Sequence, residues 1–361
     1  PLTMQCGWGA VGFLGGDMAF YDGLFNALGL RDWCDQGASA APMSMADLLK
    51  ANRADAIDPN AEIFPFPSLD ELNRACGQIG QTRDFTSGIE DSFLAARSGL
   101  KAVLDPLTQP LSWALDGALY VFETTPWWII VPLLVFFAWF VSRSFWVTVF
   151  VAASFVFLGV IDHLLVALQT LSIIFVCTGL SVLFGVPIGI AMSKSDRLQR
   201  ALVPLLDLLQ TLPTFVYLIP LIFLFSVTES KLYGIAIILY AIVPVIRLTD
   251  LGIRLVDKDV LEAADAYGMN ASQRLKKVEL PLALPNIMAG VNQTIMMSLA
   301  MVVIASLVSA PGLGVLVLRG IRNLELGVGI VAGFGIVLLA VVLDRTSKAA
   351  LSRVDKANTK Q

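Results

Sequence analysis

The sequence predicts an all-α membrane protein with about seven transmembrane helices and a long N-terminal tail outside the cytoplasm. Of its 361 residues, 56% are hydrophobic and 15% are charged, and the mean hydropathy is +0.74. Soluble domains are about 45–50% apolar and about 25% charged, so this composition excludes a soluble protein. Long apolar segments and a sorting of Lys and Arg between alternate loops predict the helices and their orientation.

The N-terminal tail, residues 1–98, contains no segment that could cross a bilayer. Residues 1–126 hold 16 acidic and 7 basic side chains, with Gly, Pro and Asn scattered among them. No basic residue precedes the first apolar residues, so we expect no signal peptide, and Pro1 indicates an incomplete terminus. We predict that this tail is extracytoplasmic, and its acidic residues add little to that orientation.

Three of the four cysteines, Cys6, Cys34 and Cys76, lie in this tail. They have no C-x-x-C spacing and no accompanying His-rich run, so we expect no metal site. If the tail is outside the cytoplasm, Cys34 and Cys76 could form a disulfide or stay unpaired. Spacing alone does not establish which, so the sequence leaves both alternatives open. Cys177 lies in an apolar segment, where we expect it to pack.

Residues 99–162 are predicted to form one amphipathic helix and two short transmembrane helices. Apolar side chains recur on one face of the amphipathic helix; they are Leu111, Leu115, Leu119 and Phe122. Trp127 and Trp128 follow, at the depth where aromatic residues gather in membranes. The helix either lies on the outer leaflet or packs on other parts of the protein, and the sequence leaves both open.

The transmembrane spans follow from the rule that such a helix needs about 20 mostly apolar residues. They are 126–142, 145–161, 165–193, 202–226, 232–250, 286–310 and 327–344. The first two nearly touch, which predicts a tight hairpin at Ser142–Ser144. The third is long enough to tilt or to extend beyond the bilayer.

Basic residues are concentrated on one side of this arrangement. Arg143, residues 193–200, residues 247–277 and the tail from Arg345 together carry 15 Lys and Arg. The loops on the other side of the membrane carry only three basic residues, which are Lys231, Arg319 and Arg322. By the positive-inside rule, we expect the N-terminus outside and the C-terminus in the cytoplasm.

One cytoplasmic loop, within residues 252–285, is patterned as two short helices rather than as a slack linker. Two pairs of residues can cap these helices: Asp257 or Asp259 for the first, and Asn270 or Ser272 for the second. Gly268 suits the left-handed position that ends the first helix. Pro281 is predicted to stop the second, because proline lacks an amide hydrogen and clashes with the preceding turn. The result is a stiff projection that we expect to dock on another protein.

The spacing within this loop resembles the EAA loop of permease subunits in bacterial ABC importers. The matching residues are Glu262, Ala263, Ala264, Gly268, Val278, Leu280 and Pro281, with Val278 where the family pattern has Ile. Four further stretches look like permeases of glycine betaine/proline betaine importers; they are 205–225, 243–256, 285–308 and 318–321. The likeness covers about residues 163–346 and is weak or absent over residues 1–100.

This resemblance implies an ABC importer type I permease core at residues 163–346, followed by a cytoplasmic tail at 347–361. It implies an inner-membrane assembly of two copies of this permease, two ATP-binding subunits and an extracytoplasmic substrate-binding protein, which imports quaternary amine solutes. In this family the EAA loop seats in a cleft of the ATPase. This chain has no P-loop, so we expect ATP and Mg²⁺ on the partner and no cofactor in the chain itself.

Polar residues within the predicted spans are candidates for the translocation path, because such groups face a cavity or another helix. They are Gln210, Thr211, Pro213 and Tyr217 in the fourth span and Asn292, Thr294 and Ser298 in the sixth. The alternative is that Asn292, Gln293 and Thr294 form hydrogen bonds between two permeases. The spans show no obvious aromatic cage for a quaternary ammonium, so we expect high affinity in the external binding protein.

Three other classes of protein fit the sequence less well. A secondary transporter would place ionisable groups near the bilayer midplane, whereas the candidates Asp207, Glu229 and Asp344 do not lie there. The only candidate catalytic pair for an enzyme is His163 beside Asp162, and the sequence has no second His and no nucleophile motif to accompany it. A channel or scaffold would not need a two-helix projection. An ABC permease for another small solute is the main alternative, and we expect contact with membrane lipid and none with nucleic acid.

Overall fold

The computed structural model describes residues 82–358, with side chains for residues 86–352. The chain divides into residues 1–98 and 99–361, and the description below concerns the second unit. Cys6, Cys34 and Cys76 lie outside the described residues. The predicted extracytoplasmic tail, residues 1–98, corresponds to the first unit, of which residues 1–81 are not described. The described helices are α5 (Thr82–Thr124), α6 (Trp127–Ser142), α7 (Phe145–Val160), α8 (Leu164–Lys194), α9 (Asp196–Thr211), α10 (Leu218–Leu224), α11 (Ser230–Arg254), α12 (Lys258–Ala266), α13 (Ala271–Arg274), the π turn η1 (Leu275–Glu279), α14 (Leu280–Ala305), the 3-10 turn η2 (Ser306–Val308), α15 (Leu313–Arg322) and α16 (Leu326–Asn358).

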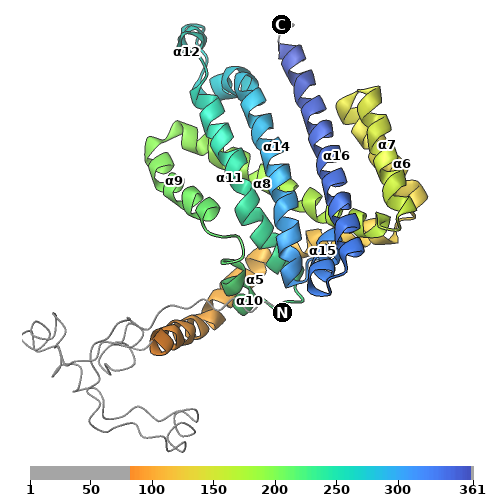
Figure 1. Ribbon diagram of the computed structural model, residues 1–361. Coiled ribbons are helices and arrows are strands. Elements are labelled where there is room, and N and C mark those ends of the chain that lie inside the picture. The colour runs from red at the N-terminus through yellow and green to blue at the C-terminus, as the bar shows by residue number, and fades with distance from the viewer. Residues whose placement is uncertain (1–81, 359–361) are drawn as a thin grey trace, which may run out of the picture. The chain divides into compact units, whose positions relative to one another are not determined.

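Four helices in the described part of the chain are long and apolar enough to cross a membrane. They are α8, α11, the continuous run from Ala271 to Val308 that contains α14, and α16 (Figure 1). α5 and α6 would count as a fifth membrane-spanning segment if they were taken as one helix, but the chain bends by 115° between them. α6 and α7 have 16 residues each, about 24 Å of helix against a hydrocarbon core of about 30 Å. The all-α membrane fold is confirmed, whereas the number of seven spans is not.

α6 and α7 form the hairpin that the sequence predicts at residues 142–144. Their bounds agree with the predicted spans 126–142 and 145–161 to within one residue. Arg143, between them, takes a left-handed φ of 50°, and its N–H donates to the carbonyl of Trp139 at 2.7 Å. The two helices pack against each other (Figure 1), so the tight hairpin is confirmed.

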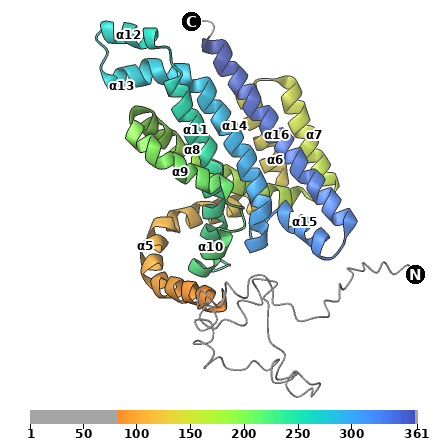
Figure 2. The same ribbon diagram turned by 60° about the vertical axis from the view of Figure 1, so that its left-hand side comes forward.

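α8, α11 and α14 form the centre of the bundle, where glycines let the backbones approach closely (Figure 2). A Cβ added at Gly189 of α8 would lie 2.6 Å from the carbonyl oxygen of Ile246 on α11. A Cβ at Gly290 of α14 would lie 3.1 Å from the Cα of Val245. Small residues of this kind permit tight helix packing in membranes. Cys177 of α8 is fully buried in the same region, which confirms that it packs.

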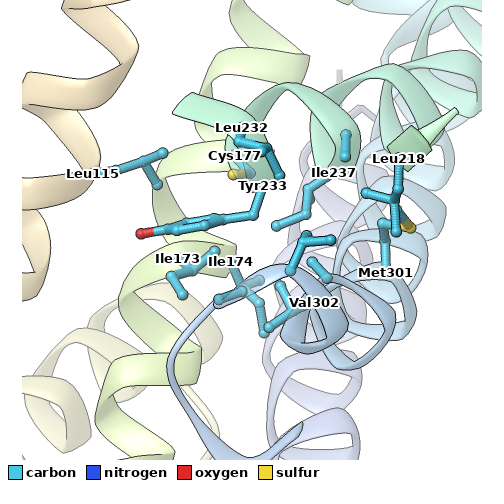
Figure 3. Close-up of a cluster of buried hydrophobic side chains, with 14 of the residues drawn as sticks. Leu115, Ile173, Ile174, Cys177, Leu218, Leu232, Tyr233, Ile237, Met301 and Val302 are labelled. Atoms are coloured by element: carbon cyan, nitrogen blue, oxygen red, sulfur yellow. The ribbon is translucent and has the colours of Figure 1, made fainter. Parts of the chain in front are cut away.

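α5 packs on this bundle through its predicted apolar face. Leu115 is fully buried in a cluster with Ile173 of α8 and Tyr233 of α11 (Figure 3). The other predicted members of that face pack against this cluster or its neighbour; they are Leu111, Leu119 and Phe122. Of the two alternatives for this amphipathic helix, packing against the rest of the protein is therefore confirmed for its apolar face. Trp113 and Tyr120 are each 67% exposed, so contact with the outer leaflet stays a prediction for their side of the helix.

The fourth predicted span, residues 202–226, is wrong as a continuous helix. α9 ends at Thr211 and α10 begins at Leu218. Leu212 adopts φ −64° and ψ 132°, the extended conformation that a residue before proline favours, because the ring of Pro213 clashes with a helical predecessor. The proline thus interrupts the helix instead of kinking it. Apolar composition alone did not indicate this, because the interrupted segment is as apolar as a span requires.

Pro281 does not end the second helix of the EAA loop, contrary to the prediction. The π turn η1 leads directly into α14, and the N–H of Leu280 donates to the carbonyl of Leu275 in an i→i+5 pattern. In a regular α-helix the proline ring clashes with the carbonyl four residues earlier. A π turn is wider than an α-helical turn, and this width accommodates Pro281 while the helix continues.

Candidate functional site

The first helix of the EAA loop (residues 252–285), α12, ends in a left-handed glycine. Gly268 takes φ +75°, and its N–H donates to the carbonyl of Asp265 at 2.9 Å. The N–H of Met269 donates to the carbonyl of Ala264 at 3.2 Å. These two hydrogen bonds form a Schellman motif, which satisfies carbonyls at the helix end. The predicted turn at Gly268 is therefore confirmed.

Side chains cap the beginnings of both short helices in this loop. Asp257 Oδ1 accepts a hydrogen bond from the N–H of Asp259 at 3.0 Å, at the start of α12. Asn270 Oδ1 accepts from the N–H of Gln273 at 2.8 Å, and Gln273 Oε1 accepts from the N–H of Asn270 at 3.0 Å. This reciprocal pair is a capping box. Of the predicted capping residues, Asp257 and Asn270 are those that act.

The residues that match the EAA pattern lie on both faces of the loop. Those exposed to solvent are Glu262, Ala263, Gly268 and Pro281. Ala264 is 5% exposed and packs beneath the loop, while Val278 and Leu280 are half-buried. Tyr267, which the sequence reasoning did not single out, is 87% exposed beside Gly268. The loop therefore presents one small, partly aromatic surface, and the other face holds it to the bundle.

Ion pairs attach this loop to the end of α8. Arg274 Nη1 lies 2.7 Å from Asp265 Oδ2 of α12, and Arg274 Nε lies 3.1 Å from Glu279 Oε1. Lys194, the last residue of α8, binds the other oxygen of Glu279. The sequence reasoning missed all four residues. No local pattern could identify the pair of Lys194 and Glu279, because 85 positions separate them.

A second network joins α8, α9 and α11 at the same end of the bundle. Arg254 of α11 pairs with Asp196 at 2.8 Å and with Asp250 at 2.9 Å, and it also donates to the carbonyl of Met192 at 2.9 Å. Gln199 of α9 donates to Asp250 at 2.8 Å. These bonds connect three helix ends at the base of the EAA loop.

Two of the three path candidates on α14, Ser298 and Asn292, form side-chain hydrogen bonds with neighbouring helices of the same chain, whereas the buried hydroxyl of Thr294 has no such partner among the described residues. Thr178 Oγ1 of α8 donates to Ser298 Oγ at 3.0 Å, and Thr294 is fully buried. Asn292 accepts from Ser347 and lies 3.5 Å from Asp344, both on α16. These hydrogen bonds of Asn292 join α14 to α16, and both a role of these three residues in the path and bonds of Asn292 to a second permease stay predictions.

The path candidates of the fourth span lie together at the break between α9 and α10. Gln210, Thr211 and Pro213 are exposed, and Tyr217 is half-buried. Gln210 Nε2 is 4.0 Å from the sulfur of Met297, and Tyr217 Oη is 3.8 Å from the sulfur of Met301. The break therefore faces the Met-rich stretch of α14.

His163 and Asp162 do not form the pair that an enzyme would need. The Nδ1 of His163 lies 2.5 Å from the carbonyl oxygen of Ile161. Asp162 is exposed and takes a left-handed φ of 58° in the turn between α7 and α8. A turn residue and a ring bound to the backbone are typical of a helix connection.

Comparison with known proteins decides the family. Residues 181–356 match the family model described as binding-protein-dependent transport system inner membrane component. The chain is 39% identical over 250 residues to the glycine betaine/proline betaine transport system permease protein ProW of Escherichia coli K12, an alignment that covers 69% of this chain and 70% of that protein. The chain belongs to this family of ABC importer permeases.

Other permeases of this family show the same likeness. The chain is 42% identical over 224 residues to the glycine betaine transport system permease protein OpuAB of Bacillus subtilis, covering 60% of this chain and 79% of that one. It is 35% identical over 263 residues to the glycine betaine/carnitine transport permease protein GbuB of Listeria monocytogenes, covering 72% and 93%. A structure of the MetNI methionine ABC transporter in inward-facing conformations aligns with a TM-score of 0.46 and 20% identity over 52% of this chain and 93% of that one.

The match to the family model places the candidate sites within the permease region. It begins inside α8 and ends inside α16, so the EAA loop and every path candidate fall within it. α5, α6 and α7 precede it. The chain is therefore an inner-membrane transport permease and a transporter subunit, which agrees with the four long apolar helices.

Proposed function

We propose that this chain is the permease of an ATP-driven importer for small quaternary amine solutes. The observation that carries the proposal is the capped, two-helix EAA loop, joined by ion pairs to the end of α8, in a chain of this family. The relatives are named for glycine betaine, proline betaine, carnitine, trimethylamine N-oxide and choline. All these solutes have a fully substituted, cationic nitrogen, and this shared chemistry supports the substrate class.

The exposed face of α12 is the proposed contact with a separate ATPase in the cytoplasm. Glu262 offers one charge, and Ala263 offers a flat surface for close approach. Gly268 fixes the angle between α12 and α13, Ala264, Val278 and Leu280 hold the loop to the bundle, and Pro281 follows η1 where the chain enters α14. ATP and Mg²⁺ bind to the ATPase in this proposal, and the permease converts its movement into opening and closing.

The break between α9 and α10 is the proposed part of the translocation path. Non-helical backbone at membrane depth is tolerated only where it is buried in protein or lines a water-filled cavity. Residues 212–217 are non-helical, and Gln210 and Thr211 beside them are exposed in this single chain. A second copy of the chain facing this surface would enclose the path. The proposed transporter therefore contains two permeases, two ATPases and an extracytoplasmic binding protein.

The break offers a weak site for a quaternary ammonium. Aromatic faces hold such cations through cation–π attraction, and Phe215 and Tyr217 stand at the break, with Phe215 58% exposed. Two rings hold a cation less tightly than a closed cage. We therefore place high-affinity selection in the external binding protein, and transient binding in this chain.

Uptake by the reconstituted assembly tests this function. Liposomes would contain the permease with its ATPase, and labelled glycine betaine would be added with the binding protein. We expect accumulation that requires ATP on the ATPase side and continues when ionophores collapse the Na⁺ and H⁺ gradients. Uptake that needs an ion gradient and no ATP would instead show a secondary transporter. ATP-driven uptake of another solute, with none of any quaternary amine, would overturn the substrate class.

A further inference from the structure

A buried carboxylate lies at the base of the EAA loop. The side chain of Glu279 is 1% exposed, and two cations from different elements bind its two oxygens. Arg274 Nε lies 3.1 Å from Oε1, and Lys194 Nζ binds Oε2. A buried carboxylate without partners is strongly unfavourable. The buried position of Glu279 therefore favours structures in which both cations stay in place.

These contacts belong to a series of four alternating charges. Arg274 Nη1 donates to both oxygens of Asp265 at 2.7 and 2.9 Å. The series therefore runs from Asp265 on α12, through Arg274 and Glu279, to Lys194 at the end of α8. It connects the exposed helix of the EAA loop to the end of α8, a central helix of the bundle, whereas the backbone of η1 leads into α14.

The π turn brings Glu279 to Arg274. In a regular α-helix, residues five positions apart point about 140° away from each other. The i→i+5 hydrogen bonds of η1 place such residues on the same side, and this pair is five positions apart. Pro281 follows at the start of α14, where the wider turn accommodates its ring. The proline of the EAA pattern and the buried carboxylate thus depend on the same turn.

We propose that Glu279 is a positioning residue that transmits movement between α12 and α8 through Lys194. This inference rests on the proposed coupling role of the EAA loop. When an ATPase displaces α12, the charge series displaces the end of α8 with it. α8 in turn contacts α14 through the hydrogen bond of Thr178 with Ser298, at 3.0 Å. Movement at the loop thereby reaches a helix that carries path candidates.

Lys194→Met is the sharpest test, because the side chain of Lys194 is 41% exposed and its loss does not open the core. The variant is assayed in the complete complex in liposomes, with ATP hydrolysis and glycine betaine uptake measured together. We expect normal binding of the ATPase, a lower unfolding temperature because Glu279 keeps Arg274 but loses its second cation, and at least a fivefold increase in ATP hydrolysed per solute imported. Lys194→Arg should restore the ratio. Arg197→Met removes an exposed charge three positions away and should leave the ratio unchanged.

A double variant tests whether the two residues act as one link. Lys194→Met combined with Glu279→Gln should be no more uncoupled than the more affected single variant, because residues of one network are not additive. Additive losses would overturn the link. So would a wild-type ratio in Lys194→Met, or a loss of ATPase binding in that variant.

Gly268→Val in the same assay separates this inference from the proposed function. Normal coupling in Gly268→Val would remove the coupling role of the EAA loop, and with it the basis of the inference. Uncoupling in Gly268→Val with normal coupling in Lys194→Met would overturn the role of Glu279 alone.

Discussion

Glu229 and Asp105 share one buried lysine at the end of the bundle opposite the EAA loop. Lys231 Nζ lies 2.7 Å from Glu229 and 2.6 Å from Asp105, and its side chain is 6% exposed. Because Asp105 belongs to α5, the cluster ties α5 to the loop before α11. Burial alone would raise the pKa of Glu229, but the hydrogen bond and charge of Lys231 outweigh it and hold this pKa below its usual value.

We predict that Glu229→Gln lowers the free energy of unfolding at neutral pH and that this effect disappears in acid. Because the folded pKa is lowered, the stabilisation is complete above the ordinary carboxyl pKa and is lost as pH falls through the folded value. A partly exposed ion pair contributes about 1 kcal/mol or less. Thermal unfolding of both proteins in detergent, from neutral pH to about pH 3, measures this. A difference that persists at the acid end would contradict the prediction.

Asn292 leads to a second prediction at this scale, because its hydrogen bonds join α14 to α16. Asn292→Leu should lower the free energy of unfolding by about 1 kcal/mol, the usual magnitude for a polar contact between membrane helices. The matched control is Gln293→Leu, because the neighbouring side chain is exposed. Unfolding and transport are measured on the same preparations. A loss of transport at unchanged stability would instead favour the role in the path that the sequence predicts.

At the scale of elements, Gly268 is the residue on which the geometry of the EAA loop depends. A Cβ added there would have no atom within 4 Å, so a substitution acts through backbone strain alone. A β-branched residue at φ +75° costs on the order of 1–2 kcal/mol. That is enough to change a short exposed helix end, and too little to disrupt the packed bundle.

We therefore predict that Gly268→Val inserts and folds normally but loses transport and substrate-stimulated ATP hydrolysis. Gly268→Asn is the matched control, since asparagine tolerates the left-handed conformation, and it should retain most activity. Ala263→Glu should act like Gly268→Val by placing an unpaired charge on the docking face. ATP hydrolysis with and without loaded binding protein measures all three. Full stimulation in Gly268→Val would leave the EAA loop without a coupling role.

The elements of this loop show which features could be predicted from the sequence. Helix caps depend on residues a few positions apart, so Gly268 and two pairs of candidate caps, Asp257 or Asp259 and Asn270 or Ser272, could predict both short helices but not which residue of each pair acts. The continuation through Pro281 was not predicted, because it depends on a π turn. The pair of Lys194 and Glu279 depends on the packing of α8 beside η1, and a sequence contains no local record of such a contact.

At the scale of the whole molecule, the charge distribution predicts which end faces the cytoplasm. The basic residues of the EAA loop, with Arg345 and Lys348 of α16, belong to the end of the bundle where α12 and the end of α16 are found (Figure 1). The turn between α15 and α16 lies at the opposite end. From the positive-inside rule we predict that α12 is in the cytoplasm and that this turn is outside.

Two single-cysteine variants test this orientation. Tyr267→Cys and Leu324→Cys replace side chains that are 87% and 88% exposed, so the protein shields both positions equally. The background carries serine at Cys6, Cys34 and Cys76, and Cys177 is retained because it is fully buried. A membrane-impermeant thiol reagent is added to intact cells and to cells with opened membranes.

We predict that Leu324→Cys is labelled in intact cells and that Tyr267→Cys is labelled only after the inner membrane is opened. The physical reason is the cost of moving Lys and Arg across the membrane during insertion, which retains the basic end in the cytoplasm. The order of labelling decides between the two orientations, because both sites are equally exposed within the protein. The reverse order would place α12 outside and would exclude its contact with a cytoplasmic ATPase. Labelling of both residues in intact cells would instead show that the chain between them crosses the membrane an even number of times.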